Sequence, residues 1–292
     1  MNTIIEITNP LEPIEYKGTI IASKKSELQE WCILDTEGSE HLFINNTLQS
    51  SKADEHIYHE MFVHSLMSGT KNISKVLVLG GSEGCMIREI LKWNVKEIVQ
   101  VDWDSTLIEY FKNEGSWNSN SYDDPRVKIV ISDAIQWIKS CDEKFDCIFI
   151  DLFDPTFETL QITENLINEC KRCLSIGGSL SINAGSINSK ATGLLALIMK
   201  KMFYTSNDFV AIRCPVPSFK EEWVFLMVVS KMWSVLIHES DLPTTNYYNK
   251  DILIKCTKWD TYYSILNEYW KPKKLTEILP KKSVDLNIYY GC

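Results

Sequence analysis

From Lys75 onward, continuous apolar runs of strand length alternate with stretches of helical periodicity. Residues 75–79, KVLVL, form the clearest run, and a run without polar alternation is typical of a strand buried on both faces. Strands that alternate with helices connect by right-handed crossovers and build a parallel sheet. The predicted strands are residues 75–79, 97–101, 127–131, 145–150 and 178–182. The predicted helices are residues 86–93, 107–113, 134–140, 164–174 and 191–202.

The alternation of strands and helices ends after the fifth predicted strand. Two apolar runs, residues 209–214 and 223–229, are separated by a short loop that contains proline, so we expect them to pair antiparallel. Five parallel strands followed by such a hairpin indicate an α/β fold, with a seven-strand methyltransferase-type Rossmann-like sheet.

The first fifty residues show a different pattern. Short β-prone runs at residues 19–22, 31–34 and 41–44 are separated by polar breaks, and residues 54–68 then have helical periodicity. So little chain makes a poor independent domain. We therefore expect a small N-terminal β-strand domain, residues 1–53, packed on a Rossmann-like domain, residues 54–292. We interpret the Tyr and Trp residues between positions 259 and 270 as core or dimer contacts.

Composition and charge exclude several classes of protein. The 292 residues carry 30 Lys and Arg against 39 Asp and Glu, and this net charge of -9 argues against a nucleic-acid-binding protein. The longest apolar runs are far shorter than the roughly 20 residues of a membrane span, and the first ten residues lack the basic region of a signal peptide. The nine cysteines have no pairing pattern, and Cys170 and Cys173 form one C-x-x-C in a predicted helix. We interpret them as reduced thiols of a cytoplasmic protein.

A glycine-rich turn follows the first strand of the parallel sheet. Residues 80–84 read GGSEG and lead into a predicted helix, which is where doubly wound sheets bind ligands. The spacing is not G-x-G-x-x-G, because Ser82 and Cys85 stand where glycines are required, so NAD and FAD are disfavoured. The carboxylate of Glu83 also fits a pyrophosphate badly, since like charges would meet.

Two further acids end the next strands. Asp102 ends the second strand, where a carboxylate can accept hydrogen bonds from both ribose hydroxyls of an adenosine, and Asp133 ends the third, within reach of an adenine edge. Taken singly, each is better explained as a solvated strand end or a helix N-cap. Together with Glu83 they indicate a nucleoside that carries a cation, such as S-adenosylmethionine or its decarboxylated form.

The fourth strand ends in a pair of acids. Asp151 and Asp154 stand in the sequence DLFDP after a strongly apolar run, and Pro155 stops the strand. Two carboxylates this close can bind an amine cation, and crowding and burial can raise the pKa of one toward the range of a general base. A loop with two turn acids is the alternative interpretation.

These motifs together resemble the polyamine aminopropyltransferases, the family of spermidine, spermine and thermospermine synthases. The resemblance extends over residues 27–230, and details such as Glu83, Asp102 and Ala134 are most similar to the thermospermine synthases. The matching segments are LQSSKADEHIYHE (48–60), GGSEG (80–84) with Arg88 and Glu89, VDWD (101–104), DDPR (123–126), SDA (132–134) and DLFDP (151–155).

The resemblance implies a Rossmann-like catalytic domain behind a small β-domain, usually in a homodimer. It implies transfer of the aminopropyl group of decarboxylated S-adenosylmethionine to a polyamine, with release of methylthioadenosine, and we expect no metal and no prosthetic group. Asp151 would be the general base, with Tyr58 and Asp154 positioning the amine. Glu83 would hold the aminopropyl ammonium, Asp102 the ribose and Asp133 the adenine. The residues so assigned to the nucleoside are Gln29, Gln49, His59, Gly80, Gly81, Glu83, Asp102, Asp133 and Ala134.

The chain also departs from the family pattern. Residues 155–166 are shorter than the family's loop, which closes over the substrates. Asn45 and Asn46 replace Asp-Gly in a hairpin, and since Asn tolerates positive φ we expect this turn to be kept. The acceptor stays open among putrescine, spermidine and longer amines. Two alternatives also stay open: an amine N-methyltransferase that uses S-adenosylmethionine, and a catalytically silent homologue that binds nucleoside or polyamine.

Overall fold

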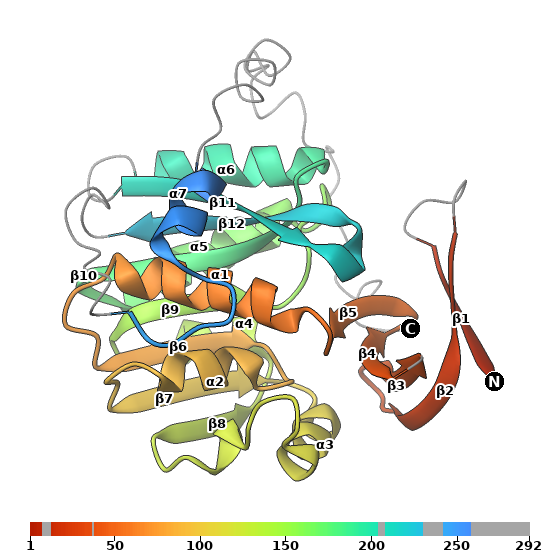
Figure 1. Ribbon diagram of the computed structural model, residues 1–292. Helices are drawn as coiled ribbons and strands as arrows, with labels where there is room; N and C mark the ends of the chain where they lie inside the picture. The colour runs from red at the N-terminus through yellow and green to blue at the C-terminus, as the bar shows by residue number, and fades with distance from the viewer. Residues whose placement is uncertain (8–12, 37, 204–207, 230–241, 258–292) are drawn as a thin grey trace.

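Figure 1 shows the computed structural model of the chain, which describes residues 1–7, 13–36, 38–203, 208–229 and 242–257. The aromatic residues between positions 259 and 270, and with them the end of the predicted second domain, lie outside the described residues.

An antiparallel sheet of five strands in sequential order forms the N-terminal part of the chain. The hydrophobic pattern predicts the three central strands and misses the two outer ones. The last strand, TLQSS, buries two serines beside one leucine and so has no apolar alternation. The turn between Asn45 and Asn46 has φ of 49° and 63°, which confirms that it is kept. The strands are β1 (Asn2–Glu6), β2 (Ile14–Lys25), β3 (Glu30–Thr36), β4 (Ser39–Ile44) and β5 (Thr47–Ser51).

A seven-stranded sheet follows and has the predicted architecture. Its order is β11-β12-β10-β9-β6-β7-β8, in which β6 to β10 run parallel and β11 and β12 add an antiparallel hairpin at one edge. The chain order reverses direction between β6 and β9, the place where open α/β sheets bind ligands. The strands are β6 (Lys75–Gly80), β7 (Glu97–Asp102), β8 (Val127–Ile131), β9 (Phe145–Asp151), β10 (Leu174–Ser186), β11 (Asp208–Val216) and β12 (Glu221–Val229).

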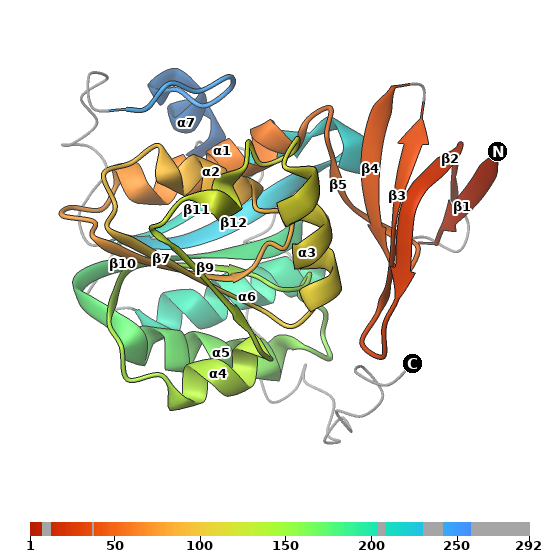
Figure 2. The same cartoon turned by 90° about the horizontal axis from the view of Figure 1, so that it is seen from below.

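Helices cover both faces of this sheet (Figure 2). One apolar core lies under α1, α2 and α3, and a second lies under α4, α5 and α6. The prediction for one segment is wrong in its bounds: α5 begins four residues earlier than expected, and β10 already begins at Leu174, which pairs with Phe145. The helices are α1 (Glu55–Ser68), α2 (Cys85–Leu91), α3 (Ser105–Glu114), α4 (Ala134–Ser140), α5 (Leu160–Cys173), α6 (Lys190–Met202) and α7 (Lys250–Thr257), with 3-10 turns η1 (Ser121–Asp123) and η2 (Pro217–Phe219).

The five-stranded sheet stands beside the carboxyl ends of the parallel strands, and polar contacts fix it there (Figure 2). The Gln29 side-chain amide donates to Asp104 at 2.8 Å, and the Trp31 indole donates to Thr106 at 2.9 Å. Asp104 and Thr106 lie just beyond β7, so the small sheet is attached where the ligand site of the larger sheet is expected. The predicted boundary at residue 53 stays a prediction.

A buried carboxylate ties a distant segment of the chain to α1. Glu60 is fully buried, and its two oxygens accept hydrogen bonds from the backbone N–H groups of Asn246, Tyr247 and Tyr248 at 2.7–2.9 Å. These hydrogen bonds supply the partners that a buried charge needs. They also hold the segment that leads into α7 against α1.

Within the described residues, none of the helices combines the length and apolar character needed to span a membrane.

The C-x-x-C pair lies in α5, where Cys170 and Cys173 are buried free thiols in the apolar core. Burial raises the pKa of Cys170. Their spacing therefore reflects helix packing against the sheet.

Gly80 allows β6 and β9 to approach each other closely. Its φ is +89°, and a Cβ placed on it would lie 1.9 Å from the backbone oxygen of Asp151. The clash is with backbone, so no side chain can move aside to relieve it. The carboxyl end of β9, which carries Asp151, is thus placed against the glycine turn.

We predict that Gly80→Ala destabilises the fold more than Gly177→Ala does. Gly177 also has positive φ, +77°, but a Cβ there meets nothing within 4 Å. It should cost only the left-handed backbone strain of about 1–2 kcal/mol. At Gly80 the same strain and the backbone clash should together cost about 3 kcal/mol or more. Urea unfolding of both variants measures the difference, and equal losses would contradict it.

Candidate active site

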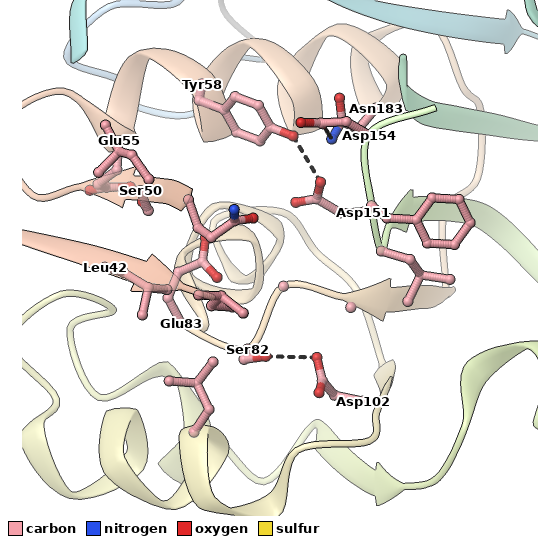
Figure 3. Close-up of a pocket in the computed structure, with 18 of the residues that line it drawn as sticks. Leu42, Ser50, Glu55, Tyr58, Ser82, Glu83, Asp102, Asp151, Asp154 and Asn183 are labelled. Carbon is pink, nitrogen blue, oxygen red and sulfur yellow. Dashed lines mark hydrogen bonds between the residues drawn. The ribbon is translucent and has the colours of Figure 1, made fainter. Parts of the chain in front are cut away.

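A single pocket between the two sheets collects every predicted site residue. It is bounded by the carboxyl ends of β6, β7 and β9, by the start of α1, and by β4 and β5 of the small sheet (Figure 3). The predicted residues that line it are Gln29, Gln49, Tyr58, His59, Gly80, Gly81, Glu83, Asp102, Asp133, Ala134, Asp151 and Asp154. Topology therefore brings residues up to 125 positions apart into one cavity, although their individual roles stay predictions.

The end of the pocket beyond β7 and β8 is built around Asp102. Its Oδ2 accepts the hydroxyl of Ser82 at 2.7 Å, and its Oδ1 accepts the backbone N–H of Asp104 at 2.9 Å. Burial raises the pKa of Asp102 to about 6 against the effect of these two hydrogen bonds. Asp133 caps α4, because its Oδ1 accepts the N–H groups of Ile135 and Gln136. The N-cap interpretation of Asp133 is thus correct, and the cap engages only one of its two oxygens.

Two glutamines reach this end from the small sheet. The amide of Gln29 is anchored on Asp104, whose other oxygen caps α3, so its position depends on the end of β7. Gln49 lies on β5 and is exposed, and its side-chain amide donates a hydrogen bond to the backbone oxygen of Thr47 at 3.3 Å. The Gln29 amide is therefore fixed at the pocket edge by a short hydrogen bond to a carboxylate, whereas that of Gln49 makes one long hydrogen bond.

A buried histidine lies between two carboxylates under the middle of the pocket. His59 is 1% exposed; its Nδ1 contacts Glu55 and its Nε2 contacts Glu83, each at 2.8 Å. Burial alone lowers the pKa of His59, but the hydrogen bonds to Glu55 and Glu83 raise it to about 10. Arg88 forms a bidentate pair with Glu55. Burial raises the pKa of Glu55, but His59 and Arg88 together lower it to about 2. Protonated His59 thus holds Glu83 at the pocket wall.

The same cluster is the one group of described residues that has metal-ligand geometry. Ligand atoms of Glu55, His59 and Cys85 all lie within 4.8 Å of one another. Both His59 nitrogens and both Glu55 oxygens are engaged by the ion pairs, however, and burial raises the pKa of the Cys85 thiol well above its ordinary value. Donors that are already paired or protonated fit a charge network better than a metal.

Asp151 lies at the centre of the pocket, at the end of β9. Its Oδ1 accepts the hydroxyl of Tyr58 at 2.8 Å, as Figure 3 shows. Burial and the nearby carboxylate of Glu83 raise the pKa of Asp151 to about 7, although Tyr58 and the His59 cation act in the opposite direction. A carboxylate with a pKa near neutrality is suited to accept and release a proton.

Asp154 sits beside Asp151 and is held by a residue that the sequence argument did not assign. The amide of Asn183 donates to Asp154 Oδ1 at 3.0 Å, and the Asn183 oxygen accepts from the Trp223 indole at 2.8 Å. Asp154 is exposed as a residue, but desolvation of its carboxyl group raises its pKa, against this hydrogen bond. Asn183 lies in the buried part of β10, directly after the predicted strand 178–182, so the strand-end reasoning that found the acids would also have found it.

Aromatic side chains form the wall at this end. The rings of Tyr58 and Phe219 meet edge to face at 6.2 Å, and Phe219 contacts Trp223 at 4.7 Å between centroids. Trp223 lines the pocket and also packs against the apolar core. Glu221 and Glu222 do not line it; they contact Ser186 and Arg213 instead.

Comparison with known proteins agrees with this geometry. Residues 55–239 match the model of the family described as spermine/spermidine synthase domain. A polyamine aminopropyltransferase of Sulfurisphaera tokodaii is 27% identical over 281 residues, which is 93% of this chain and 92% of that protein. One from Sulfolobus acidocaldarius is 31% identical over 213 residues, 71% of this chain and 70% of that protein. A crystal structure of spermidine synthase in complex with the transition state analogue AdoDATO has the same fold, with a TM-score of 0.81, 22% identity and coverage of 90% and 94%.

We predict that Asp151→Asn stabilises the protein in a pH-dependent way. Because the pKa of Asp151 is about 7 when folded and ordinarily 3.8, the unfolded chain ionises first as pH rises, so the wild type loses stability between pH 4 and 7. The variant avoids this loss. It should be more stable by about 1–3 kcal/mol at pH 8 and equally stable at pH 4.

Chemical unfolding at both pH values measures this effect. Asp142→Asn is the matched control, since the Asp142 side chain is fully exposed and should change neither value. A stability difference between Asp151→Asn and wild type that is the same at pH 4 and pH 8 would contradict the prediction.

Proposed function

The chain belongs to the spermine/spermidine synthase family and is a polyamine aminopropyltransferase, and we propose that it transfers the aminopropyl group of decarboxylated S-adenosylmethionine to an amine, with Asp151 as general base. The observation that carries this assignment is the raised pKa of Asp151 together with its position in the pocket. Its pKa is raised to about 7, it is fixed by Tyr58, and it lies in the same pocket as Glu83.

The nucleoside binds at the end of the pocket beyond β7 and β8. Asp102 accepts the ribose hydroxyls, for which the Ser82 hydroxyl is displaced or shared. The Asp133 oxygen that the helix cap leaves unused accepts from the adenine amino group, with Ala134 beside it. Gln29 and Gln49 close over the nucleoside from the small sheet, and Gly80 and Gly81 let the backbone approach it.

Glu83 receives the ammonium of the aminopropyl group. The protonated His59 fixes one Glu83 oxygen, Oε1, and leaves the other for the ligand. Ordinary S-adenosylmethionine carries an additional carboxylate at this position, which Glu83 would repel. The site therefore favours the decarboxylated nucleoside.

The acceptor amine lies between Asp151 and Asp154. Each carboxylate has one oxygen engaged, Asp151 by Tyr58 and Asp154 by Asn183, so one oxygen of each remains for the amine. An alkylammonium has a pKa of roughly 10.4 and must lose a proton to Asp151 before it can react. The nitrogen lone pair then forms a bond to the carbon next to sulfur, the C–S bond breaks, and its electron pair neutralises the sulfonium. The protein mainly aligns these atoms.

Three features are proposed on the resemblance to the family: a homodimer, a cytoplasmic location without a nucleic-acid or membrane partner, and chemistry without a metal. The paired donor atoms of Glu55 and His59 and the protonated thiol of Cys85 support the last of them. Dialysis against a chelator should leave turnover unchanged, and sedimentation velocity should give twice the chain mass of 33.7 kDa.

We predict that Asp151→Asn lowers kcat roughly 10²–10⁴-fold, because it removes the general base and keeps the side chain's shape. Purified protein is incubated with decarboxylated S-adenosylmethionine and putrescine, spermidine or spermine, and the products are identified by mass spectrometry. Glu221→Gln is the matched control, since this exposed acid lies outside the pocket. The panel also tests the thermospermine-synthase prediction, because the product names the amine.

Ordinary S-adenosylmethionine is run in parallel. A methylated amine formed from it, without aminopropyl transfer, would replace the proposal by an N-methyltransferase. No product with either donor would favour a silent homologue.

A further inference from the structure

The side-chain amide of Asn183 has a defined orientation. Its Oδ1 accepts hydrogen bonds from the Trp223 indole N–H at 2.8 Å and from the backbone N–H of Gly185 at 2.9 Å. Both of these groups can only donate. The end of the amide that faces them must therefore be the oxygen, and the NH2 group must face Asp154.

A β-bulge brings these groups together. The pairing of β10 with β12 shifts register between Asn183 and Ser186, which is where Trp223 pairs. Gly185 lies inside the bulge with φ of +77°, and a Cβ on it would approach Pro155 and Asp154 at 3.4 and 3.7 Å. Bulges re-aim side chains next to sites in this way. The irregular register is what lets one strand supply both the Asn183 amide and the N–H that orients it.

We infer that Trp223 is a positioning residue for the acceptor amine: its indole N–H fixes the Asn183 amide, which in turn holds Asp154 with one oxygen engaged and the other open to the pocket. This inference rests on the proposed function, in which Asp154 positions the amine. Trp223 does so without forming a bond to the substrate.

An amide turned the other way would oppose this arrangement. It would place the carbonyl oxygen of Asn183 against the carboxylate of Asp154, two acceptors with no proton between them. Asp154 would lose its only hydrogen bond known from the described residues and turn away from the amine. Amine binding should weaken, whereas the nucleoside, which lies at the other end of the pocket, should not be affected.

The test compares Trp223→Phe, Asn183→Leu and the double variant with wild type. Phenylalanine keeps an aromatic ring beside Phe219 and removes the indole donor, together with part of the ring volume. The KM for the amine should rise about 3–10-fold in Trp223→Phe and about 10–100-fold in Asn183→Leu, the range expected for losing a neutral and a charged hydrogen bond. The KM for the nucleoside should stay within twofold in both. Trp137→Phe is the control, since Trp137 lies on α4 outside the pocket.

The double variant separates positioning from direct contact. If Trp223 acts through Asn183, Trp223→Phe adds nothing to the KM for the amine once Asn183 is leucine. Multiplying effects would mean that Trp223 touches the amine, and they would overturn the inference. So would an unchanged KM in a folded Trp223→Phe protein.

Amine binding by calorimetry, with methylthioadenosine present, repeats the comparison without turnover. A wild type that binds the amine but forms no aminopropylated product would overturn the proposed function alone. Equal amine affinity in wild type and in Trp223→Phe would overturn the positioning role alone.

Discussion

The protonated imidazole of His59 is the cation on which the pocket depends. Seven acidic residues line that cavity, and among the described residues no lysine or arginine does. His59 lies between Glu55 and Glu83 with both ring nitrogens hydrogen-bonded, and Arg88 balances the negative charge of Glu55. Without this buried cation the Glu83 carboxylate would face its neighbours uncompensated, which a buried charge tolerates badly. The remaining acids can then stay close together for a cationic ligand.

This balance explains why the acids differ from one another. Asp102 is buried and Asp151 is half-buried, yet hydrogen bonds from Ser82 and the Asp104 backbone limit the rise in the pKa of Asp102 to about 6. At Asp151 the carboxylate of Glu83 adds to the effect of burial, and the pKa is about 7. The local hydrogen bonds and charges around each strand end therefore set the pKa of each acid separately.

The sequence predicts the larger sheet and the pocket well, because both follow from chain topology. Parallel strands place their carboxyl ends at one edge, so acids that end successive strands must meet there. The hydrophobic pattern cannot show β5, whose buried residues are partly serine, or the bulge at Asn183, which depends on pairing with β12. It also cannot show that Gln29 lies on Asp104, since that contact joins two separate sheets. For Asp133 the helix cap and the predicted ligand contact are compatible, because the cap uses one oxygen.

The carboxylate of Glu60 has a consequence for the order in which the chain is made. Its hydrogen-bond donors lie 186, 187 and 188 residues later in the sequence. During synthesis on the ribosome α1 therefore emerges long before the backbone groups that Glu60 needs when it is buried. Burial of an unpartnered carboxylate is costly, so the buried position of α1 depends on a segment that is made 186 residues later. Tyr58 and His59 lie on the same helix, so the geometry of the acidic pocket depends on a segment that emerges from the ribosome long after α1.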